Sequence, residues 1–330
     1  MNKIIRIPTT ILFLGCLLVL AGCHIFGNQK ETEPEYIWQK MDGFADQEIR
    51  ELALRDDETL AVATDSGIYI NQSLDQPLQR ADLPASLDFS IVREIITSDT
   101  LFYFSTFTFV NQMWSSVDGQ KWELLLTKKK PMFNIWITPQ GNRIIGTWHG
   151  VYRQLGGTSD VELVTFLYTD HFAGLDRITS VTQTSSGALF CGSHDGVYRS
   201  LDDGLKWVKV SHDIHKSKDF VVALYTDSNN HIYAQTLFGE LYRSEDDGDS
   251  WEKMGGFDGL GVKEATFPGN ETVVAMTSEA VWKASLTDGK FRKVGPDHSP
   301  EYKKMGAIEN GKIVVATDSS LFIGVPNPSY

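Results

Sequence analysis

The most constraining feature of the sequence is a pattern that returns about every 42 residues. Segments 198–207 and 242–251 share Y-R-S-x-D-D-G-x-x-W, and their tryptophans lie 44 residues apart. Segment 114–122 keeps the serine, the Asp-Gly pair and the tryptophan but has Val117 in the expected aspartate position. Segment 282–291 is one residue shorter and ends in phenylalanine. Self-similarity at such a period indicates that one structural unit is copied along the chain.

The units can be counted from the aromatic residue of each third apolar run. These residues recur at intervals of 38 to 46 positions: Tyr69, Trp114, Tyr152, Tyr198, Tyr242, Trp282 and Phe322. Within each unit the runs are short, rich in β-branched and aromatic residues, and separated by turn residues, which is typical of strands. Four strands per unit, repeated seven times, predict an all-β chain folded as a seven-bladed β-propeller of four-stranded antiparallel blades.

A fragment of the repeat stands alone near the start of the chain. Segment 38–44, "WQKMDGF", matches 251–257, "WEKMGGF", at five of seven positions. The last unit, which begins near Tyr302, lacks this piece, and a ring built without it would leave an unpaired sheet edge. We therefore predict that residues 36–41 form the outer strand of the last blade. Residues 36–330 would then be one closed domain.

The first residues have the features of an export signal. Lys3 and Arg6 precede an apolar run at 11–20 that is too short to span a bilayer. "VLAGC" at 19–23 resembles a bacterial lipobox, and the resemblance implies cleavage before Cys23 and lipidation of its sulfur. An ordinary secretion signal is the alternative. We expect a signal peptide at 1–22, a lipidated cysteine and flexible tether at 23–35, and a membrane-anchored, extracytoplasmic protein of the bacterial cell envelope, on the outer membrane if the cell is Gram-negative.

Charge and residue types narrow the classes of partner. Removing the two basic residues of the signal leaves 28 basic and 43 acidic side chains, a formal net charge of −15. This argues against nucleic acid or anionic lipid as the main partner. Cys191 would be the only cysteine after the anchor and is expected as a buried thiol. His212 and His215 lack a third ligand at a suitable spacing, so we expect no metal. The sequence has no P-loop and no dinucleotide fingerprint, so we expect no cofactor. We also expect a monomer.

The repeated turn points to a family. S-x-D-x-G-x-x-W resembles the Asp-box, or bacterial neuraminidase repeat, of sialidase-like and photosystem-stability-factor-like propellers. Serine and aspartate side chains can pin such a turn through backbone hydrogen bonds, glycine permits a positive φ, and tryptophan supplies apolar area. We therefore assign these residues a structural role and name no catalytic residue. The matching residues are Ser200, Asp202, Gly204, Trp207, Ser244, Asp246, Gly248 and Trp251.

The loops at the opposite end of the predicted ring gather histidine, aspartate and aromatic residues, which favours a recognition surface. The candidates are Trp148, His149, Tyr168, Asp170, His171, His194, Asp195 and Phe238. Near the channel rim, Arg50, Arg93 and Lys263 are candidate contacts for an anion. The alternative for these cations is pairing with the adjacent Glu51, Glu94 and Glu264, or with the next blade.

Two functions fit these features. The favoured one is a non-enzymatic binding or scaffold module for a protein or glycan partner. The alternative is a sialidase-like or other Asp-box glycoside hydrolase. The resemblance implies that a sialidase would need three arginines on a carboxylate, a tyrosine–glutamate nucleophile and an aspartate acid. The family's Arg-Ile-Pro signature occurs here as Arg6-Ile7-Pro8, inside the expected signal peptide.

Overall fold

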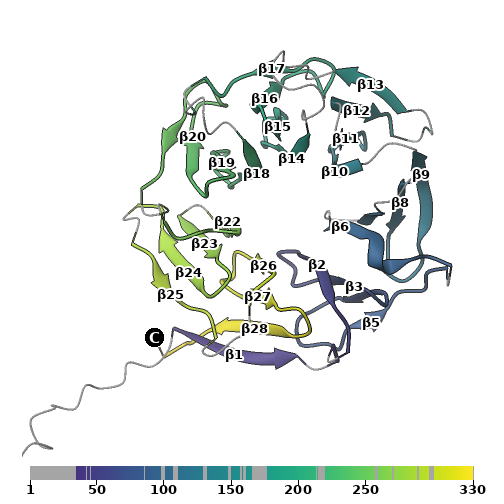
Figure 1. Cartoon of the computed structure of the whole chain (residues 1–330), viewed down its shortest axis with the longest axis vertical. Helices are drawn as coiled ribbons and strands as arrows, with labels where there is room; N and C mark the ends of the chain where they lie inside the picture. The colour runs from purple at the N-terminus through teal and green to yellow at the C-terminus, as the bar shows by residue number, and fades with distance from the viewer. Residues whose placement is uncertain are drawn as a thin grey trace, which may run out of the picture.

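The fold is a ring of seven four-stranded antiparallel sheets around a central axis (Figure 1). This confirms the predicted seven-bladed β-propeller. The structure is a computed structural model. It describes residues 35–41, 43–44, 46–84, 86–97, 101–106, 111–128, 132–147, 150–156, 158, 161–165, 177–212, 214, 220–255, 257, 259–269, 271–287, 290–296 and 301–329.

Each blade runs from an inner strand A to an outer strand D, in chain order for six of the seven. The blades are as follows: blade 1, β2 (Ile49–Leu54), β3 (Leu60–Thr64), β4 (Ile68–Asn71) and β5 (Gln79–Arg80); blade 2, β6 (Val92–Thr97), β7 (Phe102–Thr106), β8 (Asn111–Ser116) and β9 (Glu123–Lys128); blade 3, β10 (Met132–Ile137), β11 (Arg143–Thr147), β12 (Gly150–Gln154) and β13 (Val161–Thr165); blade 4, β14 (Ile178–Gln183), β15 (Leu189–Ser193), β16 (Gly196–Ser200) and β17 (Val208–Lys209). The others are blade 5, β18 (Val221–Thr226), β19 (Ile232–Thr236), β20 (Leu241–Ser244) and β21 (Glu252–Lys253); blade 6, β22 (Glu264–Thr266), β23 (Thr272–Met276), β24 (Val281–Ser285) and β25 (Arg292–Lys293); and blade 7, β26 (Lys304–Ala307), β27 (Ile313–Ala316), β28 (Leu321–Pro326) and β1 (Tyr36–Met41). A short 3-10 helix, η2 (Phe89–Ile91), precedes blade 2.

Blade 7 is built from both ends of the chain, as predicted. Strand β1 pairs antiparallel with β28, from Tyr36 opposite Pro326 to Met41 opposite Leu321. The Tyr36 hydroxyl donates to the Gly311 carbonyl at 3.0 Å, and the Trp38 indole donates to the Val294 carbonyl at 2.7 Å. The N-terminal strand therefore occupies the edge that would otherwise remain open.

The apolar core is divided among the seven interfaces between neighbouring blades. For example, Ile68 and Ile70 of blade 1 pack with Phe102, Phe104 and Trp122 of blade 2. Six further clusters occupy the other interfaces, including the one that joins blade 7 to blade 1. Because both faces of each sheet are covered, the second strands are buried at nearly every position.

The repeated turns at 200–207 and 244–251 have the same geometry. In the first, the Ser200 hydroxyl accepts from the Gly204 N–H at 2.9 Å, and the Asp202 carboxylate accepts from the Lys206 N–H at 2.8 Å. Gly204 has φ +83°, a conformation that favours glycine. The Trp207 indole donates to the Gly204 carbonyl at 3.0 Å.

The second turn repeats these contacts with Ser244, Asp246, Gly248 and Trp251. Here the Asp246 carboxylate also accepts from the Ser250 hydroxyl at 2.6 Å. That bond, aided by the Ser250 N–H, holds the pKa of Asp246 below its usual value even though partial desolvation opposes the shift. The carboxylate is therefore ionised and engaged in holding the turn.

The turn at 116–122 corrects one expectation from the sequence. Placing Val117 at the aspartate position was wrong, because this turn is one residue shorter. Ser116 and Asp118 take the two roles: the Ser116 hydroxyl accepts from the Gly119 N–H at 2.9 Å, and Asp118 accepts from the Lys121 N–H at 2.9 Å. Val117 is 76% exposed.

Candidate functional site

The strand order gives the ring two distinct faces. Connections between antiparallel neighbours alternate ends, so the A–B and C–D connections share one face and the B–C and D–A connections share the other. We call the first the turn face, because it carries the repeated serine–aspartate turns, and the second the loop face. The ligand-binding candidates that the structure describes belong to the loop face.

Three of these eight candidates lie in the described part of the chain: His194, Asp195 and Phe238. His194 and Asp195 form the B–C turn of blade 4, and Phe238 belongs to the B–C turn of blade 5. The other five, together with the proposed lipidation site Cys23, lie outside the described residues: Trp148, His149, Tyr168, Asp170 and His171.

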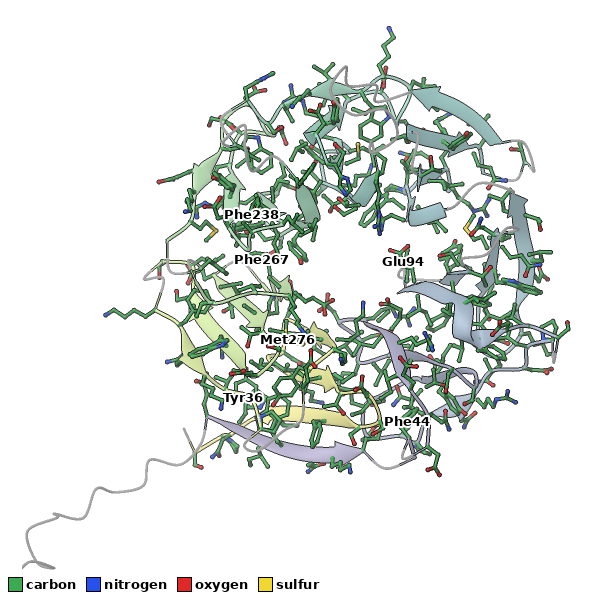
Figure 2. All side chains as sticks on the ribbon, in the orientation of Figure 1. Tyr36, Phe44, Glu94, Phe238, Phe267 and Met276 are labelled. Carbon is green, nitrogen blue, oxygen red and sulfur yellow. The ribbon has the colours of Figure 1, made fainter. Side chains whose placement is uncertain are left out.

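Two of the described candidates belong to a cluster that we call the loop-face patch, in which half-buried His194 is joined by the exposed side chains of Phe220, Leu237 and Phe238. The His194 ring centroid lies 4.9 Å from that of Phe220, and the Leu237 N–H donates to the Phe220 carbonyl at 2.8 Å. Phe238 is 62% exposed, Leu237 59% and Phe220 36%. Figure 2 labels Phe238 beside blade 5. Large apolar side chains that gather on a surface indicate an interaction site.

Asp195 supports this patch from within blade 4. Its carboxylate accepts from the Tyr198 hydroxyl at 2.6 Å and lies 3.2 Å from the Lys209 ammonium. The Asp195 N–H donates to the Ser193 hydroxyl at 3.1 Å. These contacts fix the tight turn that carries His194, so Asp195 orients the patch.

Arg50 and Lys263, two of the candidate anion contacts, form ion pairs with glutamates other than their neighbours in sequence. Arg50 lies 2.7 Å from the Glu48 carboxylate, and Lys263 lies 2.6 Å from that of Glu301, which precedes blade 7. The Lys263 pair thus reaches toward the next blade, as one alternative held. The Arg93 side chain lies outside the described residues.

Pairing with the adjacent glutamates was wrong for Arg50 and Lys263. Glu51 instead lies 2.7 Å from the Lys304 ammonium, and Glu264 accepts from the Met305 N–H at 2.9 Å, both across blade boundaries. In blade 1 the ladder register shifts between Ile49 and Glu51, which makes Arg50 the extra residue of a β-bulge and turns it away from Glu51. Burial raises the pKa of Glu264 to about 7, against the opposing charge of Lys304.

A cavity that sequence reasoning missed opens on the turn face at the axis of the ring. It encloses about 720 Å³ and is lined by the ends of inner strands and by A–B turns, including Arg55, Asp57, Trp136, Gln183 and Phe267. The Trp136 indole donates to Gln183 at 3.1 Å, which joins blades 3 and 4. No local motif announces this cavity, because each blade contributes only a few residues to it.

The charge of this axial cavity bears on the glycosidase alternative. Among its described lining residues, Arg55 is the one arginine, and its guanidinium lies 2.8 Å from the Asp57 carboxylate. Asp56, Asp227 and Glu309 add further acidic groups. This wall favours a neutral or cationic ligand over a carboxylate, whereas the sialidase resemblance implies three converging arginines.

The described residues hold neither a metal-binding cluster nor a helix that could span a membrane. No group of three or more histidine, cysteine, aspartate or glutamate side chains in this part of the chain is arranged to hold a metal ion. No helix there is long and apolar enough to cross a membrane. Cys191 is fully buried and burial raises the pKa of its thiol, so it is protonated and packed in the core.

Comparison with known proteins supports the fold. No family model and no curated protein matches the chain. Among solved structures, it is similar to YCF48 bound to D1 peptide, with a TM-score of 0.67, 10% identity, and coverage of 90% of this chain and 97% of that one. It is also similar to YCF48 from Cyanidioschyzon merolae, with a TM-score of 0.65, 12% identity, and coverage of 87% of this chain and 98% of that one. A third similar structure is a catalytically inactive virginiamycin B lyase from Staphylococcus aureus with quinupristin. Its TM-score is 0.69 and its identity 11%, with coverage of 89% of this chain and 100% of that one. At these identities the likeness concerns the propeller fold.

Proposed function

We propose that this protein is a non-enzymatic binding module that holds a partner protein against its loop face, while a lipidated Cys23 anchors it to the outside of a bacterial membrane. The loop-face patch carries this proposal. Phe220, Leu237 and Phe238 present apolar surface to solvent, and among the aromatic side chains of the described residues only these two phenylalanines are exposed. Desolvating such a cluster is a main source of binding energy at protein interfaces.

The patch fits a protein better than a sugar. Its apolar part includes Leu237 and two phenylalanines, and its polar neighbour Asp195 is already paired with Tyr198 and Lys209. A glycan site needs several polar groups with hydrogen-bonding capacity left for hydroxyls. An apolar side chain of a protein would instead fill the space beside His194 and Phe220. YCF48, which shares this fold, has been solved with a peptide bound.

The position of the N-terminal strand agrees with this arrangement. As the outer strand of blade 7, β1 begins at Tyr36 on the turn face and ends at Met41 on the loop face. A tether between Cys23 and Glu35 would therefore join the ring at its turn face and reach roughly 40 Å when extended. The loop face would then point away from the membrane surface and remain accessible to a partner.

Differential recovery of a partner tests the proposal. Membranes that contain the tagged wild type, Phe238→Ser or Leu201→Ser protein are solubilised in detergent, and the tagged protein is recovered together with whatever it binds. Leu201 is a matched control because it is 71% exposed but lies in the repeated turn of blade 4, on the turn face. We expect one protein recovered with wild type and Leu201→Ser and lost with Phe238→Ser. Equal recovery by all three, or binding of a glycan array in place of a protein, would refute a protein-binding loop face.

The anchor is tested separately by Cys23→Ala. We expect the variant to leave the detergent phase in a phase-separation assay, whereas wild type stays in it, because acyl chains supply the membrane affinity. Retention of Cys23→Ala in the detergent phase would contradict lipidation without affecting the loop-face result.

A further inference from the structure

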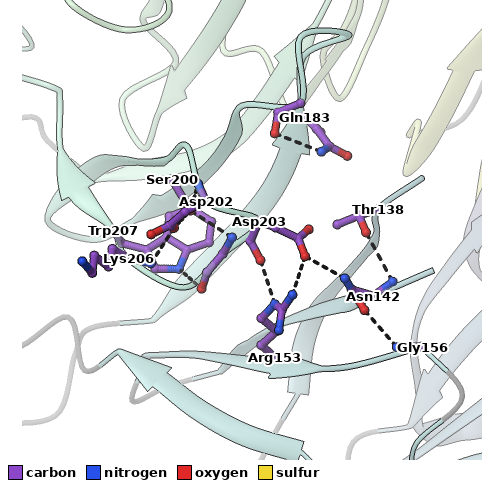
Figure 3. Close-up of polar contacts among 12 residues, drawn as sticks. Thr138, Asn142, Arg153, Gly156, Gln183, Ser200, Asp202, Asp203, Lys206 and Trp207 are labelled. Carbon is purple, nitrogen blue, oxygen red and sulfur yellow. Dashed lines mark hydrogen bonds and ion pairs between the residues drawn. The ribbon is translucent and has the colours of Figure 1, made fainter. Parts of the chain in front are cut away.

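At two blade interfaces, a basic residue of strand C binds the C–D turn of the following blade. In blade 3, the Arg153 Nε donates to the Asp203 carbonyl at 2.8 Å, and the same guanidinium forms an ion pair with the Asp203 carboxylate (Figure 3). In blade 4, the equivalent Arg199 donates to the Asp247 carbonyl at 2.7 Å and to the Asp249 carboxylate at 2.8 Å. Each arginine thus binds one carbonyl and one carboxylate of an acidic turn.

The tryptophan of that turn completes the contact between blades 4 and 5. The Trp251 indole donates to the Val210 carbonyl at 2.9 Å and is 7% exposed. Val210 directly follows strand D of blade 4, and its N–H donates to Val197 of strand C. The site that holds an acidic turn, which we call the seat, therefore has three parts. They are a cation on strand C, a backbone carbonyl after strand D, and an apolar surface for the aromatic ring.

The interface between blades 5 and 6 repeats the cation and the backbone carbonyl of the seat, and the part of the blade 6 turn that the structure describes lacks the tryptophan. Arg243 occupies the register position of Arg199, opposite the first residue of strand D. Its guanidinium lies 2.6 Å from the carboxylate of Glu245, which is 56% exposed and belongs to the same blade. Met254 takes the place of Val210, with its N–H donating to Leu241. The aromatic residue of blade 6 is Phe291, which has no N–H to offer the Met254 carbonyl.

An open groove of about 400 Å³ lies at this place. Its floor is apolar: Phe257, Val273 and Ala284 are buried, and Phe291 packs edge-on against Phe257 with ring centroids 4.6 Å apart. Arg243, Glu252 and Lys253 line it with charged groups. A Cβ atom built on Gly255, which also lines the groove, would meet no other atom within 4 Å.

We propose that this groove binds an acidic turn of a partner protein in the manner in which Arg199 holds the turn of blade 5. A carboxylate of the partner would displace Glu245 from Arg243, a donor N–H would reach the Met254 carbonyl, and an apolar side chain would cover Phe257 and Phe291. The Arg243–Glu245 pair is accessible to solvent, with side chains 26% and 56% exposed, so it contributes little stability and exchanging it costs little. The proposal rests on charge complementarity and on the occupied seat between blades 4 and 5, whose arginine contact recurs between blades 3 and 4. It is independent of the loop-face patch.

The test uses a probe taken from the chain itself. A cyclic peptide containing residues 244–251, Ser-Glu-Asp-Asp-Gly-Asp-Ser-Trp, is titrated calorimetrically into the full-length protein. We expect binding to wild type, at least tenfold weaker binding to Arg243→Ala, and at least tenfold weaker binding of a peptide carrying Asp249→Asn. Gly255→Phe should block the groove, since the added side chain starts in open space.

Two further variants separate this proposal from a purely structural role. Arg199→Ala should lower the melting temperature without changing peptide affinity, because its seat is filled from within the chain. Phe291→Trp should raise the melting temperature and weaken peptide binding, since an indole can then reach the Met254 carbonyl. No binding to wild type up to about 1 mM peptide, or equal affinity for wild type and Arg243→Ala, would overturn the proposal.

Discussion

Removing β1 should open the ring. Tyr36 is 3% exposed, and burial of such an aromatic side chain stabilises a fold by about 1.5–3 kcal/mol. Trp38, which lies over Gly324, adds a similar amount. The side-chain hydrogen bonds of Tyr36 to Gly311, Trp38 to Val294 and Lys283 to Glu35 contribute about 1 kcal/mol each. The total of roughly 6–9 kcal/mol is comparable with the whole stability of a typical domain, about 5–15 kcal/mol.

The assay compares chains that begin at residue 35 and at residue 42 by thermal and urea unfolding. We expect the shorter chain to be largely unfolded or aggregated at 37 °C, with β28 left as an open edge. A synthetic peptide of residues 35–44 should restore its melting transition, and the same peptide with Trp38→Ala should not. If the two chains melted within a degree or two of each other, the reasoning from strand closure would be refuted.

Three other perturbations test particular contacts. Trp251→Phe removes the indole donor from the buried Val210 carbonyl and should cost about 1–3 kcal/mol in urea unfolding, whereas an unchanged midpoint would contradict this role. Wild type should lose stability as the pH falls below about 4, because a carboxyl whose pKa is lowered in the folded state stabilises the fold only while it is ionised. Asp246→Asn should reduce this loss. If the free energy of unfolding fell equally steeply with pH in the two proteins, the role of Asp246 would be contradicted. Glu264 has a raised pKa of about 7, so wild type should lose stability as the pH rises from about 4.5 to 7, and Glu264→Gln should abolish that decline in melting temperature measured at pH 5 and pH 8; a decline that persists in the variant would point to other groups.

The sequence was most informative where a pattern is repeated and local. Blade number and ring closure could be predicted because Trp38, Trp122, Trp207 and Trp251 mark the same place in four of the seven units, at spacings that fit one period. Strand pairing within a blade follows from such marks, since neighbours in the chain are neighbours in the sheet. Even the isolated strand at 36–41 could be placed, because the last unit lacked its counterpart.

Prediction failed where the pattern allowed two alignments or where contacts depend on other blades. The partner of Lys263 is Glu301 and not its neighbour Glu264, because strand geometry directs adjacent side chains to opposite sides. The turn at 116–122 was misaligned by one residue, since Ser115 and Ser116 both fit the pattern. The axial cavity gave no local signal, because residues such as Arg55, Trp136 and Phe267 meet there only once the ring has closed.

The shared seventh blade also has a consequence for synthesis on the ribosome. Strand β1 emerges first, but its partner β28 follows about 280 residues later, which at 5–20 residues per second corresponds to a wait of about 15–60 s. Throughout that interval the flank of blade 1 formed by Ile49, Leu60 and Val62 has no blade 7 to cover it. A nascent chain that stalls before residue 321 would keep this apolar flank of blade 1 exposed to solvent. Proteases and chaperones could then recognise incomplete chains by the same surface that full-length chains bury last.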